Sequence, residues 1–443
     1  MKTKSVYYIL ILSAILLSCG ENRDSQNQVR LKGQLIEMGS NEVRMSYNGA
    51  SSQIGNSRDI ILNTDDQGYF DTVLVITEPS YYNLSRNTLY LTPGDDLTVG
   101  ITTSNEEAEF SGTGATVNNY MKYRLFPKGG SFLEAGRNIK GDFTTTKNTI
   151  DSLAEIRQHQ LDTLTDASNE FKDLETARIK ADVINSYMMF PSYARINDRT
   201  PVLESMAPHI KPMIEEIKDP KYLDVAVVRD VFSRSTDSLN QALFFSEITI
   251  PQRTVELFEG SAEVRKLSSS ATPETAEEVS AYVSTMENDD FAEEINYKIA
   301  QASKVFPGQP AIDIELTDAD GNQVNLSDFK GKVIYVDLWA TWCGPCLQEA
   351  PYYEALSTKF NEEEIVFLPI STDRNSEVWL EYLESNPKQL KQYHSVDGKL
   401  QEEWSLQFIP RFLLIDQDFN IVNSYAPRPS DEETEELLSS LLN

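Results

Sequence analysis

Two cysteines separated by two residues, Cys343 and Cys346, limit what this chain can be more than any other feature of its sequence. An apolar run at 333–338 precedes them and a helix-like stretch at 347–351 follows, so the pattern predicts a strand, a dithiol and a helix. A cysteine at the start of a helix meets free backbone N–H groups and the positive end of the helix dipole, which lower the pKa of its thiol. We therefore expect Cys343 to be the nucleophile and Cys346, one turn further on, to form a disulfide with it.

Length and charge restrict the class of protein further. A chain of 443 residues is expected to form two or three domains, and a hydrophobic content of 40% is typical of globular proteins. The formal net charge is -30. This charge argues against nucleic acid as a partner and against a polybasic contact with anionic lipid, because phosphate recognition needs clustered Lys and Arg.

The amino terminus has the pattern of a secretory signal peptide over residues 1–18: two early lysines, an apolar stretch at 6–17 and small residues around Cys19. This stretch is shorter than the roughly 20 residues that a membrane-spanning helix needs. The residues around Cys19 resemble a bacterial lipobox, which implies lipid attachment to Cys19 and a tether over 19–28. The alternative is a signal peptide without lipid.

Cysteine usage then favours redox chemistry. With Cys19 occupied by lipid, the exported chain keeps only Cys343 and Cys346, and the very short loop that they close adds little stability. Zinc would need two more soft ligands, and neither His159 nor His209 has a partner at metal-ligand spacing. We expect no metal and no cofactor other than the dithiol, and we expect both histidines to be ordinary surface or core residues.

Residues 29–115 are predicted to form a β-rich, sandwich-like domain. Short apolar runs alternate there with turn signals, which predicts strands at 29–35, 42–47, 59–62, 69–76, 81–84 and 96–101. The tyrosines of this domain are expected to pack at the sheet faces; partner binding is the alternative.

Residues 116–303 have helical spacing instead. The periodicity predicts helices at 150–164, 174–189, 202–217 and 223–245, and two more between 272 and 305. Prolines are expected to separate these helices, at Pro191, Pro201, Pro220 and Pro251. We expect this region to be a spacer or a partner surface, because it contains no recognisable chemistry.

Residues 304–443 carry a specific family resemblance. The run from Asp337 to Cys346, together with 408–416, resembles the thioredoxin fold. The Gly-x-Pro-Ala segment at 308–311, and Glu349 three residues after Cys346, are similar to the TlpA/ResA-like branch of membrane-tethered bacterial thiol-disulfide oxidoreductases. Related lipoproteins of Bacteroidetes-type bacteria carry a similar β domain ahead of the oxidoreductase. The resemblance implies an added hairpin before an α/β thioredoxin core.

The same resemblance implies roles for individual residues. Asp337 matches a buried aspartate that exchanges a proton with the second cysteine, although a strand-end aspartate in water is the simpler interpretation. Glu349 could share that task, although its position alone predicts a solvated helix acid. Pro410 matches a cis proline, so the Ile409 backbone could pair with an extended substrate strand.

Two further residues near the dithiol are interpreted from their positions. Trp342 could flank the sulfur of Cys343 and contact substrate. Arg411 departs from the small polar residue usual after the proline, and it is interpreted as a surface residue.

The sequence therefore predicts a lipid-anchored thiol-disulfide oxidoreductase of the bacterial cell envelope, with its thioredoxin-like domain in the periplasm. It would reduce disulfides of exported proteins, for example in cytochrome c maturation, and take electrons from a membrane thiol donor. A peroxiredoxin-like peroxidase is an alternative. Such enzymes usually have a Pro-x-x-x-Thr-x-x-Cys loop, and this chain has Asp337 in place of the proline four residues ahead of Thr341, which weakens the alternative. The other alternative is a binding or scaffold lipoprotein of the cell envelope with a secondary redox role.

Overall fold

Residues 27–36, 42–122, 130–360, 364–395, 400 and 403–442 are described by a computed structural model. The predicted signal peptide, the predicted lipid site at Cys19 and most of the tether lie outside these ranges. Within them, no helix combines the length and the apolar character needed to cross a membrane.

The β-rich region forms two four-stranded sheets, in the orders β4-β1-β7-β8 and β3-β2-β5-β6. Its strands are β1 Gln28–Leu35, β2 Glu42–Tyr47, β3 Ile60–Asn63, β4 Tyr69–Val75, β5 Ser80–Leu84, β6 Asn87–Leu91, β7 Asp96–Ile101 and β8 Glu109–Gly112. Side chains alternate between buried and more exposed along β2, and the buried side chains of both sheets form one hydrophobic cluster.

The six predicted strands of this region are confirmed, but β6 and β8 were not predicted. β6 follows β5 across a two-residue turn at Ser85 and Arg86, where Ser85 has a φ of 55°. Hairpin turns of this kind are usually marked by glycine or asparagine, so the sequence contains no signal of the reversal. The tyrosines do pack: Tyr47, Tyr81, Tyr82 and Tyr90 are buried, whereas Tyr69 is exposed.

Nine helices follow among the described residues: α1 Ala115–Lys122, α2 Phe143–Asp162, α3 Asn169–Tyr193, α4 Thr200–Ile217, α5 Ala226–Ser233, α6 Ser238–Asn240, α7 Gln252–Leu267, α8 Pro273–Val283 and α9 Asp289–Ser303. The single helix predicted at 223–245 is wrong, because α5 ends at Ser233 and a 3₁₀ helix at 234–236 separates it from α6. Pro191 does not separate helices either: it lies inside α3, close to its end, where a missing N–H costs few hydrogen bonds.

The carboxy-terminal region is a seven-stranded sheet in the order β10-β9-β13-β12-β11-β14-β15. Its strands are β9 Glu315–Asp318, β10 Gln323–Asn325, β11 Val333–Trp339, β12 Ile365–Ser371, β13 Tyr393–His394, β14 Arg411–Ile415 and β15 Ile421–Asn423, and its described helices are α10 Gly344–Ser357, α11 Ser376–Ser385 and α13 Thr434–Ser440. The central strand β11 is buried along its whole length, parallel to β12 and antiparallel to β14.

This arrangement confirms the predicted thioredoxin fold and its added hairpin, β9 to β10. The two-residue strand β13 was not predicted. The short helix expected at 400–404 lies partly outside the described residues.

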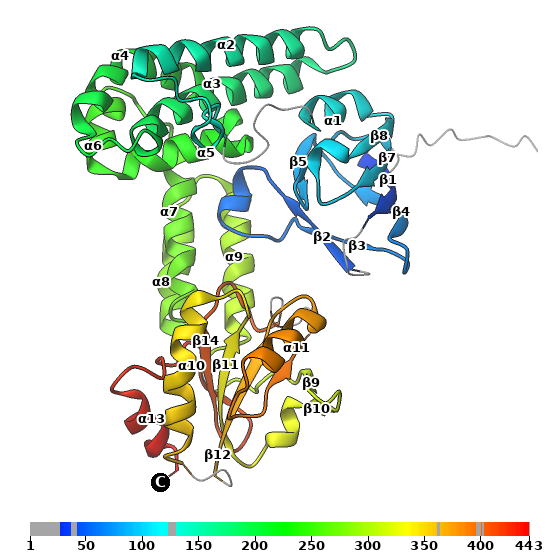
Figure 1. Ribbon diagram of the computed structural model, residues 1–443, viewed down its shortest axis with the longest axis vertical. Helices are drawn as coiled ribbons and strands as arrows, with labels where there is room; N and C mark the ends of the chain where they lie inside the picture. The colour runs from blue at the N-terminus through cyan, green and yellow to red at the C-terminus, as the bar shows by residue number, and fades with distance from the viewer. Residues whose placement is uncertain are drawn as a thin grey trace, which may run out of the picture.

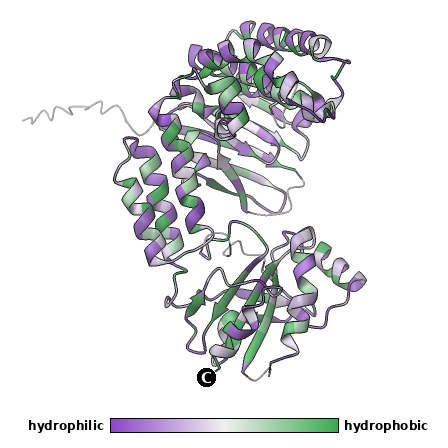
Figure 2. Cartoon of the chain, turned by 90° about the vertical axis from the view of Figure 1, so that its left-hand side faces the viewer, coloured by the Kyte–Doolittle hydropathy of each residue, from purple (hydrophilic) through white to green (hydrophobic). Residues whose placement is uncertain are grey.

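Figure 1 shows an upper body of β1–β8 and α1–α6, a lower body that contains the carboxy-terminal sheet, and a column of α7, α8 and α9 between them. One hydrophobic core runs from β11 through this column to Ala50 and Ile54 of the β-rich region, so it crosses the predicted boundary at 303/304. Figure 2 shows the apolar strands at the centre of the lower body. The domain limits given above stay predictions.

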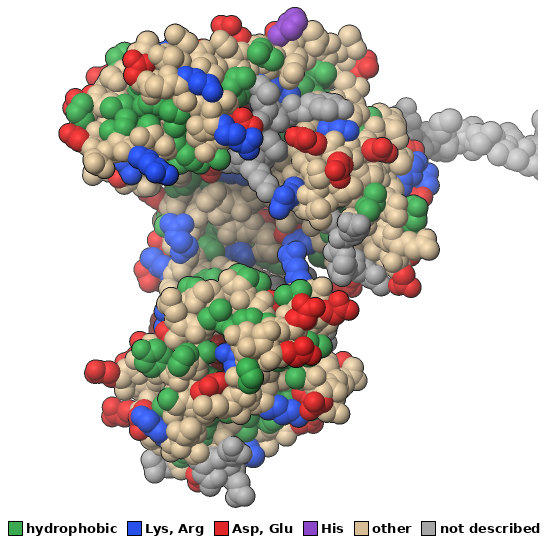
Figure 3. All heavy atoms as spheres, viewed as in Figure 1, with side chains coloured by type: hydrophobic (Ala, Val, Ile, Leu, Met, Phe, Trp, Pro, Cys, Tyr) green, Lys and Arg blue, Asp and Glu red, His purple; other side chains and the backbone are tan. Residues whose placement is uncertain are grey.

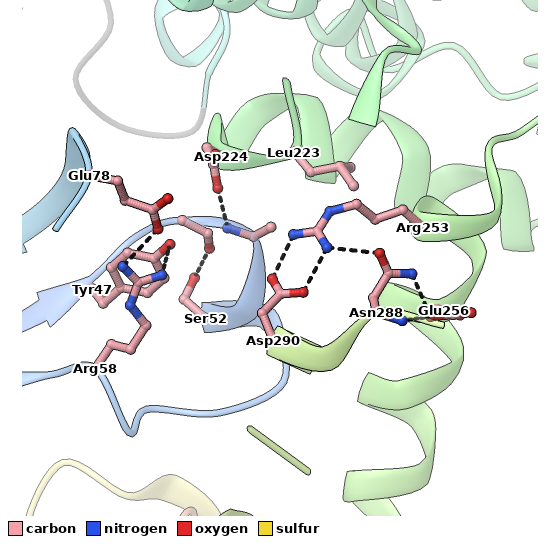
Figure 4. Close-up of polar contacts among 12 residues, drawn as sticks. Tyr47, Ser52, Arg58, Glu78, Leu223, Asp224, Arg253, Glu256, Asn288 and Asp290 are labelled. Atoms are coloured by element: carbon pink, nitrogen blue, oxygen red, sulfur yellow. Dashed lines mark hydrogen bonds and ion pairs between the residues drawn. The ribbon is translucent and has the colours of Figure 1, made fainter. Parts of the chain in front are cut away.

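Polar contacts within the upper body and within the column lie near the junction of these two parts (Figure 4). The backbone N–H of Ala50 donates to the carboxylate of Asp224 at 2.8 Å. Arg253 of α7 donates to Asn288 at 2.9 Å and to Asp290 of α9 at 2.7 and 2.6 Å. The column is packed against both bodies because the shared hydrophobic core contains residues of the β-rich region, of the column and of the carboxy-terminal sheet.

Candidate active site

The dithiol lies where β11 ends and α10 begins. Cys343 is the residue before the first residue of α10, and it forms a disulfide with Cys346 across a Cα–Cα distance of 5.3 Å. The N–H of Cys346 donates to Cys343 Sγ at 3.2 Å. In the reduced protein this donor and the helix dipole would stabilise a thiolate on Cys343, so the geometry suits Cys343 as the nucleophile.

Asp373 holds the loop that leads into the dithiol. Its carboxylate accepts hydrogen bonds from the N–H of Thr341 at 2.9 Å and from the Thr341 hydroxyl at 2.8 Å. Ser371 donates to the same carboxylate at 2.8 Å. Sequence reasoning missed Asp373; the available signal was its position just after β12, because parallel neighbours such as β11 and β12 end at the same edge of a sheet.

A groove of about 710 Å³ opens beside the dithiol. It is lined by Trp342, Thr372, Asp373, Arg374, Asn375, Val378, Leu406, Gln407, Phe408 and Ile409. The structure thus brings the predicted contact residues Trp342 and Ile409 together, although 66 residues lie between them in the sequence. The Ile409–Pro410 peptide bond is cis, as the family resemblance implied.

Asp337 lies on the other side of the dithiol. Asp337, Cys346 and Lys388 line a cavity of about 20 Å³, which exceeds the roughly 10–15 Å³ that one water needs. Burial raises the pKa of Asp337 to about 8; the charge of Lys388 opposes this shift and Glu349 adds to it. The prediction that this carboxyl is buried with a raised pKa is confirmed, and the interpretation as an aspartate in water is wrong.

Glu349 contacts residues near the carboxy terminus. Its carboxylate accepts from the N–H of Ser430 at 3.2 Å and from the Ser430 hydroxyl at 3.0 Å, and Arg428 stands 3.7 Å away. The side chain is buried, so it is not the solvated helix acid that its position alone suggested. Its part in proton exchange stays a prediction.

Arg411 is buried, so its interpretation as a surface residue is wrong. Its guanidinium donates to the backbone carbonyls of Ser424 at 2.8 Å and of Trp404 and Ser405 at 2.9 Å, and it lies 4.2 Å from the ring centroid of Tyr425. Burial lowers the pKa of this guanidinium. Arg411 therefore fixes the loop that carries Phe408 and Ile409 into the groove.

No group of three or more His, Cys, Asp or Glu within the described ranges is placed to hold a metal ion. The groups that the structure brings together at this site are the cysteine pair, the buried carboxyl of Asp337 beside Cys346 and a largely apolar groove.

Residues 306–441 match the Redoxin family. The thiol-disulfide oxidoreductase ResA of Bacillus cereus is 25% identical over 142 residues, which are 32% of this chain and 82% of ResA. A crystal structure from Bacteroides vulgatus, provisionally described as a thiol-disulfide oxidoreductase, is 61% identical, covers 32% of this chain and 99% of that one, and has a TM-score of 0.31. The thioredoxin domain of a thiol-disulfide oxidoreductase from the same organism is 28% identical, covers 31% of this chain and 98% of that domain's chain, and has a TM-score of 0.29.

Proposed function

Because the carboxy-terminal region of this chain is a ResA/TlpA-like thiol-disulfide oxidoreductase domain, we propose that the protein reduces disulfide bonds of exported proteins in the bacterial cell envelope. One observation supports this most: the two cysteines face different surroundings. Trp342, next to Cys343, lines the open groove, whereas Cys346 lines the small cavity that holds Asp337. Cys343 itself is only 4% exposed in the disulfide form, so a substrate sulfur would reach it from the groove past Trp342, while a proton acceptor stands beside Cys346.

The first step is attack of the Cys343 thiolate on one sulfur of the substrate disulfide. The substrate S–S bond breaks, a mixed disulfide forms on Cys343, and the departing substrate thiolate takes a proton from water. Trp342 and Ile409 would contact the substrate chain during this step, since both line the groove.

In the second step, Cys346 releases the substrate. The ionised carboxylate of Asp337 accepts the thiol proton of Cys346, and the resulting thiolate attacks Cys343 Sγ. The mixed disulfide breaks, the enzyme disulfide forms, and the substrate leaves as its second thiolate. Two electrons have then passed from the enzyme dithiol to the substrate. A pKa of about 8 suits Asp337 to this exchange near neutral pH.

The direction of transfer follows from the residues between the cysteines. Gly344 and Pro345 match the pair found in reducing thioredoxins, and thioredoxin has a potential of about -270 mV against about -120 mV for strong oxidants. A dithiol donor in the membrane would return the enzyme to its reduced form. The resemblance implies no cofactor for the reaction.

The place of action follows from the amino terminus. Lipid on Cys19 would hold the protein on a membrane with the dithiol in the periplasm, and several acyl chains would anchor it stably. Cytochrome c maturation and general repair of exported cysteines are both suitable uses of such a reductase.

The test is a trap in cells with the Cys346→Ser variant. This variant keeps the nucleophile but cannot release the substrate, so exported proteins should remain bound through Cys343 as mixed disulfides that dithiothreitol reduces. Cys343→Ser is the matched control and should capture none. Purified wild-type protein should reduce insulin disulfides, whereas peroxide consumption without insulin reduction would replace this proposal with a peroxidase.

A further inference from the structure

Among the described residues that line the groove beside the dithiol, Arg374 is the cation. Arg374 is exposed, lines the groove, and forms no hydrogen bond or ion pair with any described residue. Its two neighbours in the loop are both engaged: Asp373 accepts from Thr341, and the side chain of Asn375 accepts from the N–H of Glu377 at 2.8 Å. The loop is therefore held at both sides of Arg374, and the guanidinium is left free.

The other charged residue among the described lining of the groove is Asp373. Its carboxylate is buried and accepts three hydrogen bonds, two from Thr341 and one from Ser371. These bonds hold the carboxylate inside the protein without removing its charge. The next carboxylate along the chain, that of Glu377 on α11, does not line the groove. Arg374 is therefore the charge that the described lining exposes to a ligand.

The net charge of the chain, -30, does not cancel this effect. Exposed charges further apart than about 8 Å are largely screened at physiological ionic strength. Distant exposed charges therefore act only weakly on a bound ligand, and Arg374 is the exposed charge among the described residues that line the groove.

Large apolar side chains line the same groove as Arg374. Trp342 is 72% exposed, and Val378 and Phe408 are each 49% exposed. Single exposed apolar residues are ordinary, but three along one groove indicate a binding surface. The groove thus offers contacts for aromatic or aliphatic side chains together with one site for an anion.

The position of the groove favours an extended ligand. Figure 1 shows that α10 starts and β12 ends at the edge of the lower body that faces the upper body. In Figure 3 the surface narrows at the column, and hydrophobic side chains gather on this edge of the lower body. A segment of unfolded chain can enter beneath the upper body more readily than a broad folded surface.

We propose that Arg374 selects substrates in which an acidic side chain stands close to the reacting cysteine, within an extended segment that also carries apolar residues. The carboxylate of the substrate pairs with the Arg374 guanidinium while the neighbouring apolar side chains cover Trp342 and Phe408. This inference rests on the proposed reductase function and names the substrate class of the same groove.

The test uses the reduced full-length protein and three synthetic peptides, each with one internal disulfide. The peptides are identical except for Glu, Gln or Lys two positions from one cysteine. Their kcat/KM values are measured as second-order rate constants of a single turnover, in which the reduced dithiol is the only electron donor, for the wild type, Arg374→Gln and Arg374→Glu, with Glu377→Gln as the matched control. Neutral hydroxyethyl disulfide is given to the wild type to establish that the dithiol reacts.

For the wild type we expect kcat/KM to be about three- to tenfold higher for the Glu peptide than for the Lys peptide, the size expected of an exposed ion pair exchanged for a repulsion. Arg374→Gln should bring this ratio close to one, and Arg374→Glu should invert it. Glu377→Gln should keep or raise it. Added salt should reduce the wild-type ratio, since exposed charges are screened.

Two results would overturn the inference. One is a wild type that reduces the Glu and Lys peptides equally well while still reducing hydroxyethyl disulfide. The other is an Arg374→Glu variant that keeps the wild-type preference. If the wild type reduces neither the peptides nor hydroxyethyl disulfide, the proposed function itself fails.

Discussion

Replacement of Asp337 by asparagine should stabilise the oxidised protein at neutral pH. The pKa of this carboxyl is about 8 in the folded protein, against about 3.9 in an unfolded chain. The folded state therefore binds more protons between these two values, and its stability falls as the pH rises from about 4 to about 8. Asparagine has nearly the same shape and stays neutral, so it removes this dependence.

The size of the effect follows from the separation of the two pKa values. Between the two pKa values, each pH unit lowers the free energy of unfolding of the wild type by about 1.4 kcal/mol. The free energy of unfolding of the variant should therefore exceed that of the wild type by about 1 kcal/mol at pH 4.5 and by about 4 kcal/mol at pH 7. The Oδ1 atom of Asp337 has no hydrogen-bond partner in the described structure. Neither the protonated acid nor the amide loses a bond there, and the two proteins should converge at low pH.

Urea unfolding of the full chain, followed by tryptophan fluorescence, measures this difference. The four tryptophans are Trp339, Trp342, Trp379 and Trp404, so their emission reports on the carboxy-terminal domain alone. Asp418→Asn, at an exposed aspartate between β14 and β15, is the matched control and should change stability by less than about 0.5 kcal/mol at every pH.

Two outcomes would refute the reasoning: a difference between Asp337→Asn and the wild type that does not vary with pH, or a variant that is less stable at pH 7. The same variant should release substrate slowly. Loss of a positioned proton acceptor costs about 10²- to 10⁴-fold in rate, so mixed disulfides on Cys343 should accumulate during turnover.

Two more predictions concern residues around the dithiol. Lys388→Met removes the positive charge that opposes the shift at Asp337, so the pKa of Asp337 should rise further above its ordinary value. Carboxyl chemical shifts followed through a pH titration measure this pKa. An unchanged or lower pKa would contradict the prediction. Asp373→Asn weakens the acceptor of the Thr341 hydrogen bonds, which should cost about 1–3 kcal/mol of stability and expose the Thr341 N–H to exchange with solvent. Hydrogen exchange measures this loss, and full protection of that amide would show that the loop does not depend on the charge.

Sequence patterns predicted those helices and strands whose formation depends on residues close together in the chain. The alternation along β2 and the continuous apolar run of β11 reflect how each strand meets its core, and both can be seen in a few consecutive residues. The same holds for Cys343, whose place at a helix start follows from the residues on either side. Local pattern failed where its signal was missing, as at the Ser85 turn and at the breaks inside 223–245.

The surroundings of the site residues depend instead on segments far apart in the chain. Arg411 is buried because carbonyls of Trp404, Ser405 and Ser424 converge on its guanidinium, and nothing next to it in the sequence indicates this. Asp373 reaches Thr341 only because β11 and β12 end side by side. Short-range periodicity thus determined which residues could act as strand, helix and nucleophile. Their burial and their hydrogen-bond partners were decided by the folded chain, because both depend on groups brought together only by strand pairing and packing.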